Sequence, residues 1–354
     1  MTATGRAMAP GGHDAVAAPT RAALPATLAL AYPGAVWLLF RSAAWARDAS
    51  GWGLGAARLG VAAALVLSAL PSIAAFASLR RKSADPSAPR TVDLLAFGAP
   101  ALYTLLRVLL AGAQAQFDDV LLWVPAWAAL TAVAAVGSRP RSAAWTPPVA
   151  GASKLRVTHG AGAAVVLATF LLLHLGNQLL GLLGVALQDE VMKTLRHWYR
   201  APWVEPVLLG VFGFLLVSGA ALLARGRGSD HPGEAGAWRT LQLATGAGLL
   251  PFLLAHVTVV LGARSLAHAN TDWSFATGGA EGLLGSLGNA RLIPYYWFAV
   301  FIVIAHLGAG LRVVLLGHGW ARSWVDRLAL GVTLGGAVLA SGIVAAMCGL
   351  RVGA

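Results

Sequence analysis

Four histidines of this chain lie in stretches that are otherwise apolar: His159, His174, His256 and His306. A neutral imidazole can form a hydrogen bond between helices, relay a proton or bind a metal through one nitrogen. Because an ionisable side chain is costly in a hydrocarbon environment, such residues are candidates for function. The competing interpretation for any one of them is a structural hydrogen bond between helices.

The depth of these histidines along their helices divides them into groups. At a rise of about 1.5 Å per residue, His174 and His256 each lie about 24 Å from the expected cytoplasmic start of their helices. They would therefore meet at one depth near the outer face, as bis-imidazole binding of a haem iron requires. His306 lies about 20 Å from the outer face, level with Ser218, so an inner haem would have His306 as its obvious axial ligand.

The composition indicates that the elements which hold these residues cross a membrane. Of 354 residues, 58% are hydrophobic and 11% charged, and the mean hydropathy is +0.70, whereas a soluble domain carries about 25% charged residues. These values exclude a soluble catalytic domain and a disordered regulator. The single Cys348 excludes an internal disulfide and a thiolate metal cage.

Runs of about 20 apolar residues, the length that crosses a bilayer core, predict an all-α polytopic membrane protein with about nine transmembrane helices. Their expected limits are 23–40, 53–78, 93–112, 119–137, 158–186, 204–224, 240–263, 293–316 and 328–349. The expected organisation is a disordered tail at 1–21, a four-helix region without assignable chemistry at 22–136, a linker at 137–157 and a five-helix cytochrome b-like bundle at 158–354.

The net charge of +12 comes from Lys and Arg that concentrate in the amino-terminal tail and in alternate loops, at 79–92, 138–157, 225–239 and 317–327. This is the positive-inside pattern, so it indicates topology and no nucleic-acid binding. We therefore predict an integral protein of a bacterial inner (cytoplasmic) membrane, with a cytoplasmic amino terminus and an outer carboxyl terminus.

The segment RVTHGAGAAVVLATFLLLHLGNQ (156–178) resembles the first helix of the cytochrome b anchor subunit of di-haem succinate:menaquinone oxidoreductases, in the succinate dehydrogenase and fumarate reductase superfamily. Two histidines are fifteen residues apart in both, and in that family the second one binds haem. The segments TGAGLLPFLLAHV, with His256, and FIVIAHLGAGLR, with His306, are similar to two further helices of that subunit. The resemblance covers residues 156 to about 350.

The resemblance implies that His174 and His256 bind an outer haem b and that His306 binds an inner one. It also shows a departure, because Ser218 stands where the family has the second inner histidine. The chain would then hold one haem, or a second haem that is five-coordinate. As implied partners, membrane quinone and flavoprotein and iron–sulfur subunits would exchange electrons with this membrane subunit of a quinone oxidoreductase.

Three further residues are candidates for cofactor binding. His159, near the cytoplasmic edge, would contact a haem propionate or a quinone, or would be an ordinary interfacial residue. Arg200, in the outer segment LRHWYRAPWVEP (195–206), would clamp a propionate or line a quinone pocket, or would belong to an aromatic belt at the interface. Arg312 would pair with an inner propionate or with lipid phosphate. Gly160, Gly162, Gly176, Gly246 and Gly248 would leave room for a porphyrin edge.

Two functions stay open. The first is a membrane-embedded haem b electron-transfer protein, which requires imidazole nitrogens about 4 Å apart, since each metal–nitrogen bond is about 2 Å long. The second is a polytopic protein without haem, a transporter or a scaffold, that uses its histidines for proton relay or helix packing. A transporter would show broken helices near the midplane and a water-accessible cavity.

Overall fold

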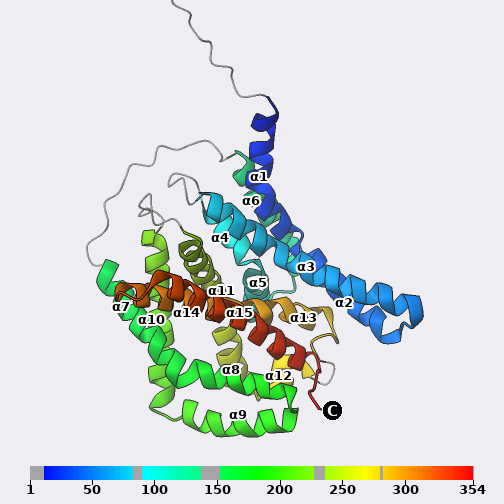
Figure 1. Cartoon of the computed structure of the whole chain (residues 1–354). Coiled ribbons are helices and arrows are strands. Elements are labelled where there is room, and N and C mark those ends of the chain that lie inside the picture. The colour runs from blue at the N-terminus through cyan, green and yellow to red at the C-terminus, as the bar shows by residue number, and fades with distance from the viewer. Residues whose placement is uncertain (1–11, 83–89, 137–151, 227–235, 280–281, 354) are drawn as a thin grey trace, which may run out of the picture.

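The computed structural model describes residues 12–82, 90–136, 152–226, 236–279 and 282–353 (Figure 1). Every regular element in these ranges is a helix, which confirms the all-α fold. Seven helices are long and apolar enough to cross a membrane, and the number rises to nine if each of two bent pairs counts as one span. The chain is an integral membrane protein whose helices satisfy their own backbone hydrogen bonds in lipid.

Six helices form the amino-terminal region: α1 (Gly12–Leu30), α2 (Tyr32–Asp48), α3 (Gly51–Lys82), α4 (Thr91–Phe97), α5 (Ala99–Gly112) and α6 (Asp119–Val136). Two of the expected spans are broken here. The axis bends by 45° between α1 and α2 and by 79° between α4 and α5. A proline lies in the first turn of α2 and of α5, and proline favours the start of a helix because it lacks the N–H that an interior position donates.

The amino-terminal tail differs from the expectation. Helix α1 begins at Gly12, so residues 12–21, which we expected to be disordered, are helical. The segment is rich in alanine, the residue with the highest helix propensity. Residues 1–11 lie outside the described part of the chain.

The carboxyl-terminal region contains the remaining elements: α7 (Ala152–Val166), the π-helical η1 (Leu167–Leu171), α8 (Leu172–Leu179), the 3-10 turn η2 (Leu180–Leu182), α9 (Val185–Tyr199), α10 (Val204–Gly226), α11 (Ala237–Ser265), α12 (Trp273–Thr277), α13 (Leu287–Ala290), α14 (Leu292–Gly317) and α15 (Arg322–Met347). The elements from α7 to η2 form one continuous span. Helix α9 occupies most of the connection between the spans expected at 158–186 and 204–224. Of the predicted linker, residues 137–151 lie outside the described residues and 152–157 begin α7.

Helix α14 joins the two regions. It packs against α11 and α15 in its own region and against α5 of the amino-terminal region. Phe97 of α4 and Phe298 of α14 have their ring centroids 5.5 Å apart, inside a hydrophobic core to which both regions contribute. The four expected amino-terminal spans and the five-helix bundle therefore share buried surface.

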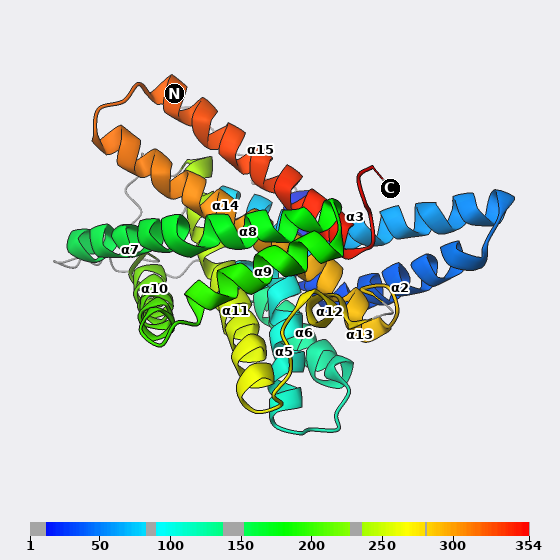
Figure 2. The same ribbon diagram turned by 90° about the horizontal axis from the view of Figure 1, so that it is seen from below.

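The five long segments of the bundle contact one another in a ring. The α7–α8 rod contacts α10 at one end and α15 at the other, while α10 packs on α11, α11 on α14 and α14 on α15. Figure 2 shows the rod crossing the molecule between α14–α15 and α10–α11. A ring of this kind places the histidines of α7, α8, α11 and α14 around a common centre.

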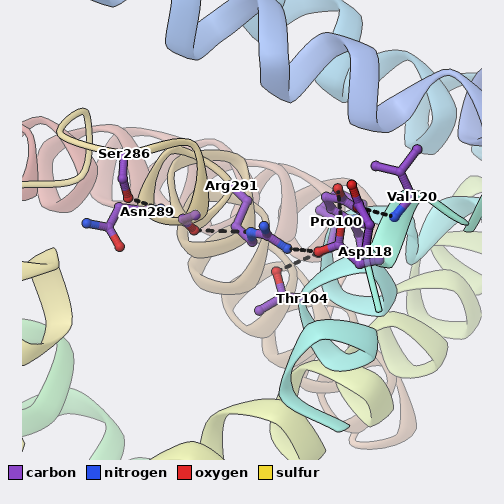
Figure 3. Close-up of polar contacts among 10 residues, drawn as sticks. Pro100, Thr104, Asp118, Val120, Ser286, Asn289 and Arg291 are labelled. Atoms are coloured by element: carbon purple, nitrogen blue, oxygen red, sulfur yellow. Dashed lines mark hydrogen bonds and ion pairs between the residues drawn. The ribbon is translucent and has the colours of Figure 1, made fainter. Parts of the chain in front are cut away.

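A polar junction ties α6 to the start of α14 (Figure 3). Arg291 forms a salt bridge with the buried Asp119 and donates from Nε to the Gly288 carbonyl at 3.1 Å. The Tyr103 hydroxyl donates to the other carboxylate oxygen of Asp119 at 2.9 Å, and the Arg291 guanidinium lies 5.1 Å from the centre of the Tyr103 ring. Asp118, beside it, accepts from the Val120 amide at 2.9 Å.

Candidate functional site

A cavity of about 2030 Å³, open over part of its surface, lies between the helices of the ring. This is about twice the upper end of the usual range for ligand pockets, ~1,000 Å³. All four intramembrane histidines line it, together with side chains that are mostly leucine, valine and alanine. Among the residues that the structure describes, those lining the cavity all belong to the carboxyl-terminal region.

His174 of α8 and His256 of α11 lie next to each other, with ring centroids 6.3 Å apart and planes at 70°. Two imidazoles that bind one metal have nitrogens about 4 Å apart, and their centroids lie roughly 2 Å further apart because the nitrogens are at the ring edges. The observed separation fits this arrangement. The angle between the planes fits as well, since each ring can rotate about its own metal–nitrogen bond.

Each of these two rings stacks on a phenylalanine one turn earlier in its helix. The centroids of Phe170 and His174 are 4.9 Å apart with planes at 15°, and those of Phe252 and His256 are 5.4 Å apart with planes at 26°. Residues at i and i+4 are neighbours on a helix surface, so the pairing is local. Within the described part of the chain neither imidazole forms a hydrogen bond, so the nitrogens of both stay available to a ligand in the cavity.

The π-helical turn η1 contains Phe170 and ends three residues before His174. Single π-helical turns inside α-helices are often found at functional sites. A π-helical turn is wider than an α-helical one, so it changes the direction in which His174 points relative to His159. His174 contacts His256 of α11, while His159 contacts Ser218 of α10.

His306 of α14 is held by a pair of hydrogen bonds on one nitrogen. Its Nδ1 lies 3.2 Å from the Gln242 carbonyl and 3.1 Å from the Thr245 hydroxyl. That hydroxyl donates to the Leu241 carbonyl at 2.6 Å, so it accepts from the imidazole. A carbonyl accepts only, so Nδ1 carries the proton and Nε2 has a free electron pair.

His159 of α7 contacts Ser218 of α10 in the same way. The distance from Nδ1 to the Ser218 hydroxyl is 2.8 Å, and this hydroxyl donates to the Phe214 carbonyl at 2.6 Å. The imidazole is therefore the donor, again from Nδ1. Ser218 is 3% exposed and is not among the residues that line the cavity, so its predicted role as a direct cofactor contact stays without support from its position.

A second arginine, Arg196, lies beside Arg200 at the predicted clamp. Arg200 donates to the Thr271 hydroxyl at 3.1 Å, and Arg196, one turn earlier, donates to the Thr271 carbonyl and to Asn270 Oδ1 at 2.9 Å. Both arginines line the cavity. Burial, together with the charge of Arg200, lowers the pKa of the Arg196 guanidinium. These hydrogen bonds tie residues 270 and 271 to α9 at the wall of the cavity.

Arg312 lies at the opposite end of the cavity. Its Nε donates to Asp326 of α15 at 2.6 Å, and its guanidinium lies 5.8 Å from the centre of the Trp238 ring. The structure therefore gives Arg312 a protein carboxylate as its partner at the place where we expected a propionate or a lipid phosphate.

The five glycines expected to make room for a cofactor divide into two groups. A Cβ at Gly160 or Gly176 would meet no atom within 4 Å, as expected for positions that border open space. At Gly246 a Cβ would lie 3.1 Å from His306, and at Gly248 it would lie 3.1 Å from Phe298. Gly162 similarly faces Leu215 at 3.3 Å, so these three glycines serve close packing.

Several residues at the cavity were missed in the sequence, among them Asn177 and Gln178. Their side-chain carbonyl oxygens are buried there without a hydrogen-bond partner among the described residues. The same holds for the hydroxyl of Tyr199, which belongs to the candidate segment 195–206. The stacking phenylalanines had a visible signal, because Phe170 to His174 reads FLLLH and Phe252 to His256 reads FLLAH. The other residues had none, since their contacts depend on how the helices pack.

No protein-family model, no curated protein and no solved structure matches this chain. The case for a function therefore depends on the geometry of the cavity and its histidines.

Proposed function

We propose that this chain is a membrane-embedded haem b electron-transfer protein that exchanges electrons with a membrane quinone. The observation that supports the proposal is the pair His174 and His256, whose centroid separation of 6.3 Å suits two imidazoles on one metal. The pair lies in the wall of an apolar cavity large enough for a porphyrin. A haem needs such a combination of two axial nitrogens and flat, apolar surroundings.

Haem iron bound there would supply one-electron chemistry, and two imidazole ligands would keep it low-spin and closed to oxygen. The protein residues have supporting roles. Phe170 and Phe252 fix the planes of the two imidazoles by stacking. Arg196 and Arg200 supply positive charge at the outer end, where a carboxylate such as a propionate would be stabilised by charge-assisted hydrogen bonds.

The quinone is the proposed partner because the cavity is apolar and belongs to helices that lie in lipid. Tyr199 offers a hydroxyl donor, which a tyrosine keeps at neutral pH, and burial raises its pKa further. A quinone carbonyl accepts such a hydrogen bond. With the cytoplasmic amino terminus that the basic loops predict, flavoprotein or iron–sulfur subunits would dock at the cytoplasmic face.

One observation favours the second candidate function, a transporter. The amino-terminal region contains two bent spans, at α1–α2 and at α4–α5, and broken helices often line transport sites. However, the described residues of this region do not line the cavity. Its buried acidic residue Asp93, in α4, already forms an ion pair with Lys82 at 2.6 Å. The breaks therefore lie apart from the histidines.

The test is a reduced-minus-oxidised absorption spectrum with a pyridine haemochrome assay, on full-length protein produced with ample haem supply. We expect a low-spin b-type spectrum that His174→Ala and His256→Ala each diminish. His197→Ala, which removes an exposed histidine of α9, is the matched control and leaves the spectrum unchanged. Absence of haem from the wild type would overturn the proposal in favour of the transporter. An unaltered spectrum in both alanine variants would overturn the ligand assignment.

A further inference from the structure

We infer that the inner end of the cavity, the end at which Arg312 lies, binds an anionic phospholipid. The phosphate would lie between Arg156 of α7 and Arg322 of α15, and the acyl chains would occupy apolar space in the cavity. This site is separate from the His174–His256 pair and does not depend on haem.

The first argument is the positive charge at this end. Within the described part of the chain, the charged residues that line it are four arginines and one aspartate: Arg156, Arg239, Arg312, Arg322 and Asp326. Asp326 accepts from Arg312 Nε at 2.6 Å, while its other oxygen lies 3.9 Å from Arg322. Arg156 has no hydrogen-bond or ion-pair partner among the described residues. One carboxylate, held mainly by Arg312, therefore leaves Arg156 and Arg322 available to an anion.

The second argument is the level of these two arginines relative to the membrane. Arg322 is the first residue of α15, and Arg156 is the fifth residue of α7, ~6 Å from the start of that helix. The half-exposed rings of Trp320 and Trp324 lie beside Arg322, with centroids 5.0 Å apart. Tryptophan concentrates where lipid headgroups meet water, so this end lies at the level of the phosphates. Arginine pairs with phosphate through two parallel hydrogen bonds.

The third argument is the way the helices separate at this end. Helix α15 packs against α8 and η2, at the far end of the rod, whereas α7 packs on α10. Figure 2 shows α7 and the α14–α15 pair diverging from there toward the inner end. Apolar residues that line the cavity on both sides are exposed, with Val157 of α7 at 71% and Val314 of α14 at 53%. An acyl chain can therefore pass from the bilayer into the cavity along apolar surface.

The fourth argument is volume. Pockets for single ligands are at most ~1,000 Å³, whereas this cavity measures about 2030 Å³. A cofactor at the His174–His256 pair would therefore leave apolar space at the inner end. Basic pockets between transmembrane helices on the cytoplasmic side bind the headgroups of anionic lipids. A soluble phosphate would use the arginines but not the apolar walls, so the combination favours a lipid.

The experiment measures lipid binding to the full-length protein in detergent by native mass spectrometry. The probes are dioleoyl phosphatidylglycerol, dioleoyl phosphatidylcholine, which has the same chains but no net charge, and inorganic phosphate. We expect phosphatidylglycerol to bind about tenfold more tightly than phosphatidylcholine, and inorganic phosphate at equal concentration to leave it bound. Arg156→Gln and Arg322→Gln should each weaken phosphatidylglycerol binding about fivefold, and the double variant about 25-fold, since each basic residue near an anionic lipid contributes about this much.

Two sets of matched controls are available. Lys154→Gln and Arg327→Gln remove exposed basic residues of the same two helices that lie outside the cavity lining, so each should change binding less than about twofold. Gly160→Leu adds a side chain at a cavity-lining position where a Cβ would meet no atom within 4 Å, so it should weaken binding of the dioleoyl lipid. Gly210→Leu, exposed and outside the lining, should leave binding unchanged.

Equal affinity for the two lipids, or equal losses in the arginine variants and their controls, would overturn the inference, because general attraction to anionic lipid would then account for binding. Displacement of the lipid by inorganic phosphate at equal concentration would also overturn it and assign the arginines to a soluble anion. The substituted arginines are exposed, so the variants should fold, and an unchanged elution profile checks this. Wild-type protein without haem would overturn the proposed function and leave this inference standing, because the lipid measurement does not involve haem.

Discussion

The amino-terminal helices and the carboxyl-terminal bundle differ in what lies between their helices. In the amino-terminal region Tyr32, Tyr103 and Trp123 form a buried aromatic cluster, with neighbouring ring centroids 5.1 to 6.3 Å apart. In the bundle, the rings of His174 and His256 instead face the cavity. One region fills its centre with its own side chains, and the other keeps its centre open.

The difference indicates which region offers space for a ligand. Atoms that line an empty space lose the dispersion contacts that a packed interior supplies, and these losses grow with the size of the void. A space of about 2030 Å³ between the helices of the bundle is therefore where we expect other molecules to lie. The packed region serves as the support against which α11 and α14, two walls of that space, are held.

The largest expected effect concerns the junction between the two regions. Asp119→Ala leaves the buried guanidinium of Arg291 without its carboxylate. Removing one partner of a buried ion pair costs about 3 to 5 kcal/mol, because the other charge stays buried. We expect the free energy of unfolding to fall by about 3 kcal/mol, measured by denaturant unfolding in detergent.

Asp48→Ala, at an exposed position at the end of α2, is the control for this variant and should have little effect. A double variant of Asp119 and Arg291 should lose less stability than the sum of the single variants, since residues in one ion pair are coupled. If the two losses of stability simply add, the Asp119–Arg291 ion pair does not hold the amino-terminal region against α14.

The next effect contrasts two glycines. Gly248→Ala would press its methyl group on Phe298 and Ile302 at 3.1 and 3.2 Å, where α11 meets α14. Overpacking of this kind costs about 1 to 3 kcal/mol. Gly176→Ala, at an exposed position of α8, would meet no atom within 4 Å, so it should be neutral or stabilise slightly, by the helix preference of alanine of about 0.5 to 1 kcal/mol. The two midpoints of thermal unfolding should shift in opposite directions, and equal shifts would contradict the comparison.

The regular spans could be predicted from the sequence because their physical cause is local. Helices α10, α11 and α14 end within a few residues of the expected limits. The equal depth of His174 and His256 followed from helix rise, and the structure adds that the two rings lie next to each other.

The other features depend on tertiary packing. The bends at Ala31 and Gly98 had a signal in Pro33 and Pro100, but proline inside an apolar run is also compatible with a continuous transmembrane helix, as Pro251 of α11 shows. The contact between His159 and Ser218 joins residues 59 apart in the chain. No spacing rule could have predicted it, because it depends on how α7 and α10 pack and on the π-helical turn that follows α7.

A smaller effect is expected for Trp123→Phe in the packed region. The indole Nε1 donates to the Ala29 carbonyl at 2.8 Å. Within α1 that carbonyl would normally accept from residue 33, which is a proline without an N–H. Phenylalanine keeps most of the ring but leaves a buried acceptor unpaired, at a cost of about 1 kcal/mol. Thermal unfolding should show this loss while the haem spectrum stays unchanged; a spectral change would mean that the two regions are not separable in function.

The smallest effect on stability is expected for Phe252→Leu, the counterpart of that variant in the open region. Leucine fills much of the same volume, and the stacking that it removes is worth about 0.5 to 1.5 kcal/mol. Its effect on the site should be clearer, because the ring of His256 has no hydrogen bond among the described residues to hold its plane. We expect haem to stay bound while the low-spin signal of the proposed His174–His256 site broadens or shifts. Leu254→Ala, at an exposed position on the same helix, is the control. If Phe252→Leu lowers stability as Trp123→Phe does and leaves the signal unchanged, the aromatic rings of the two regions have the same role, and stacking does not orient the ligand.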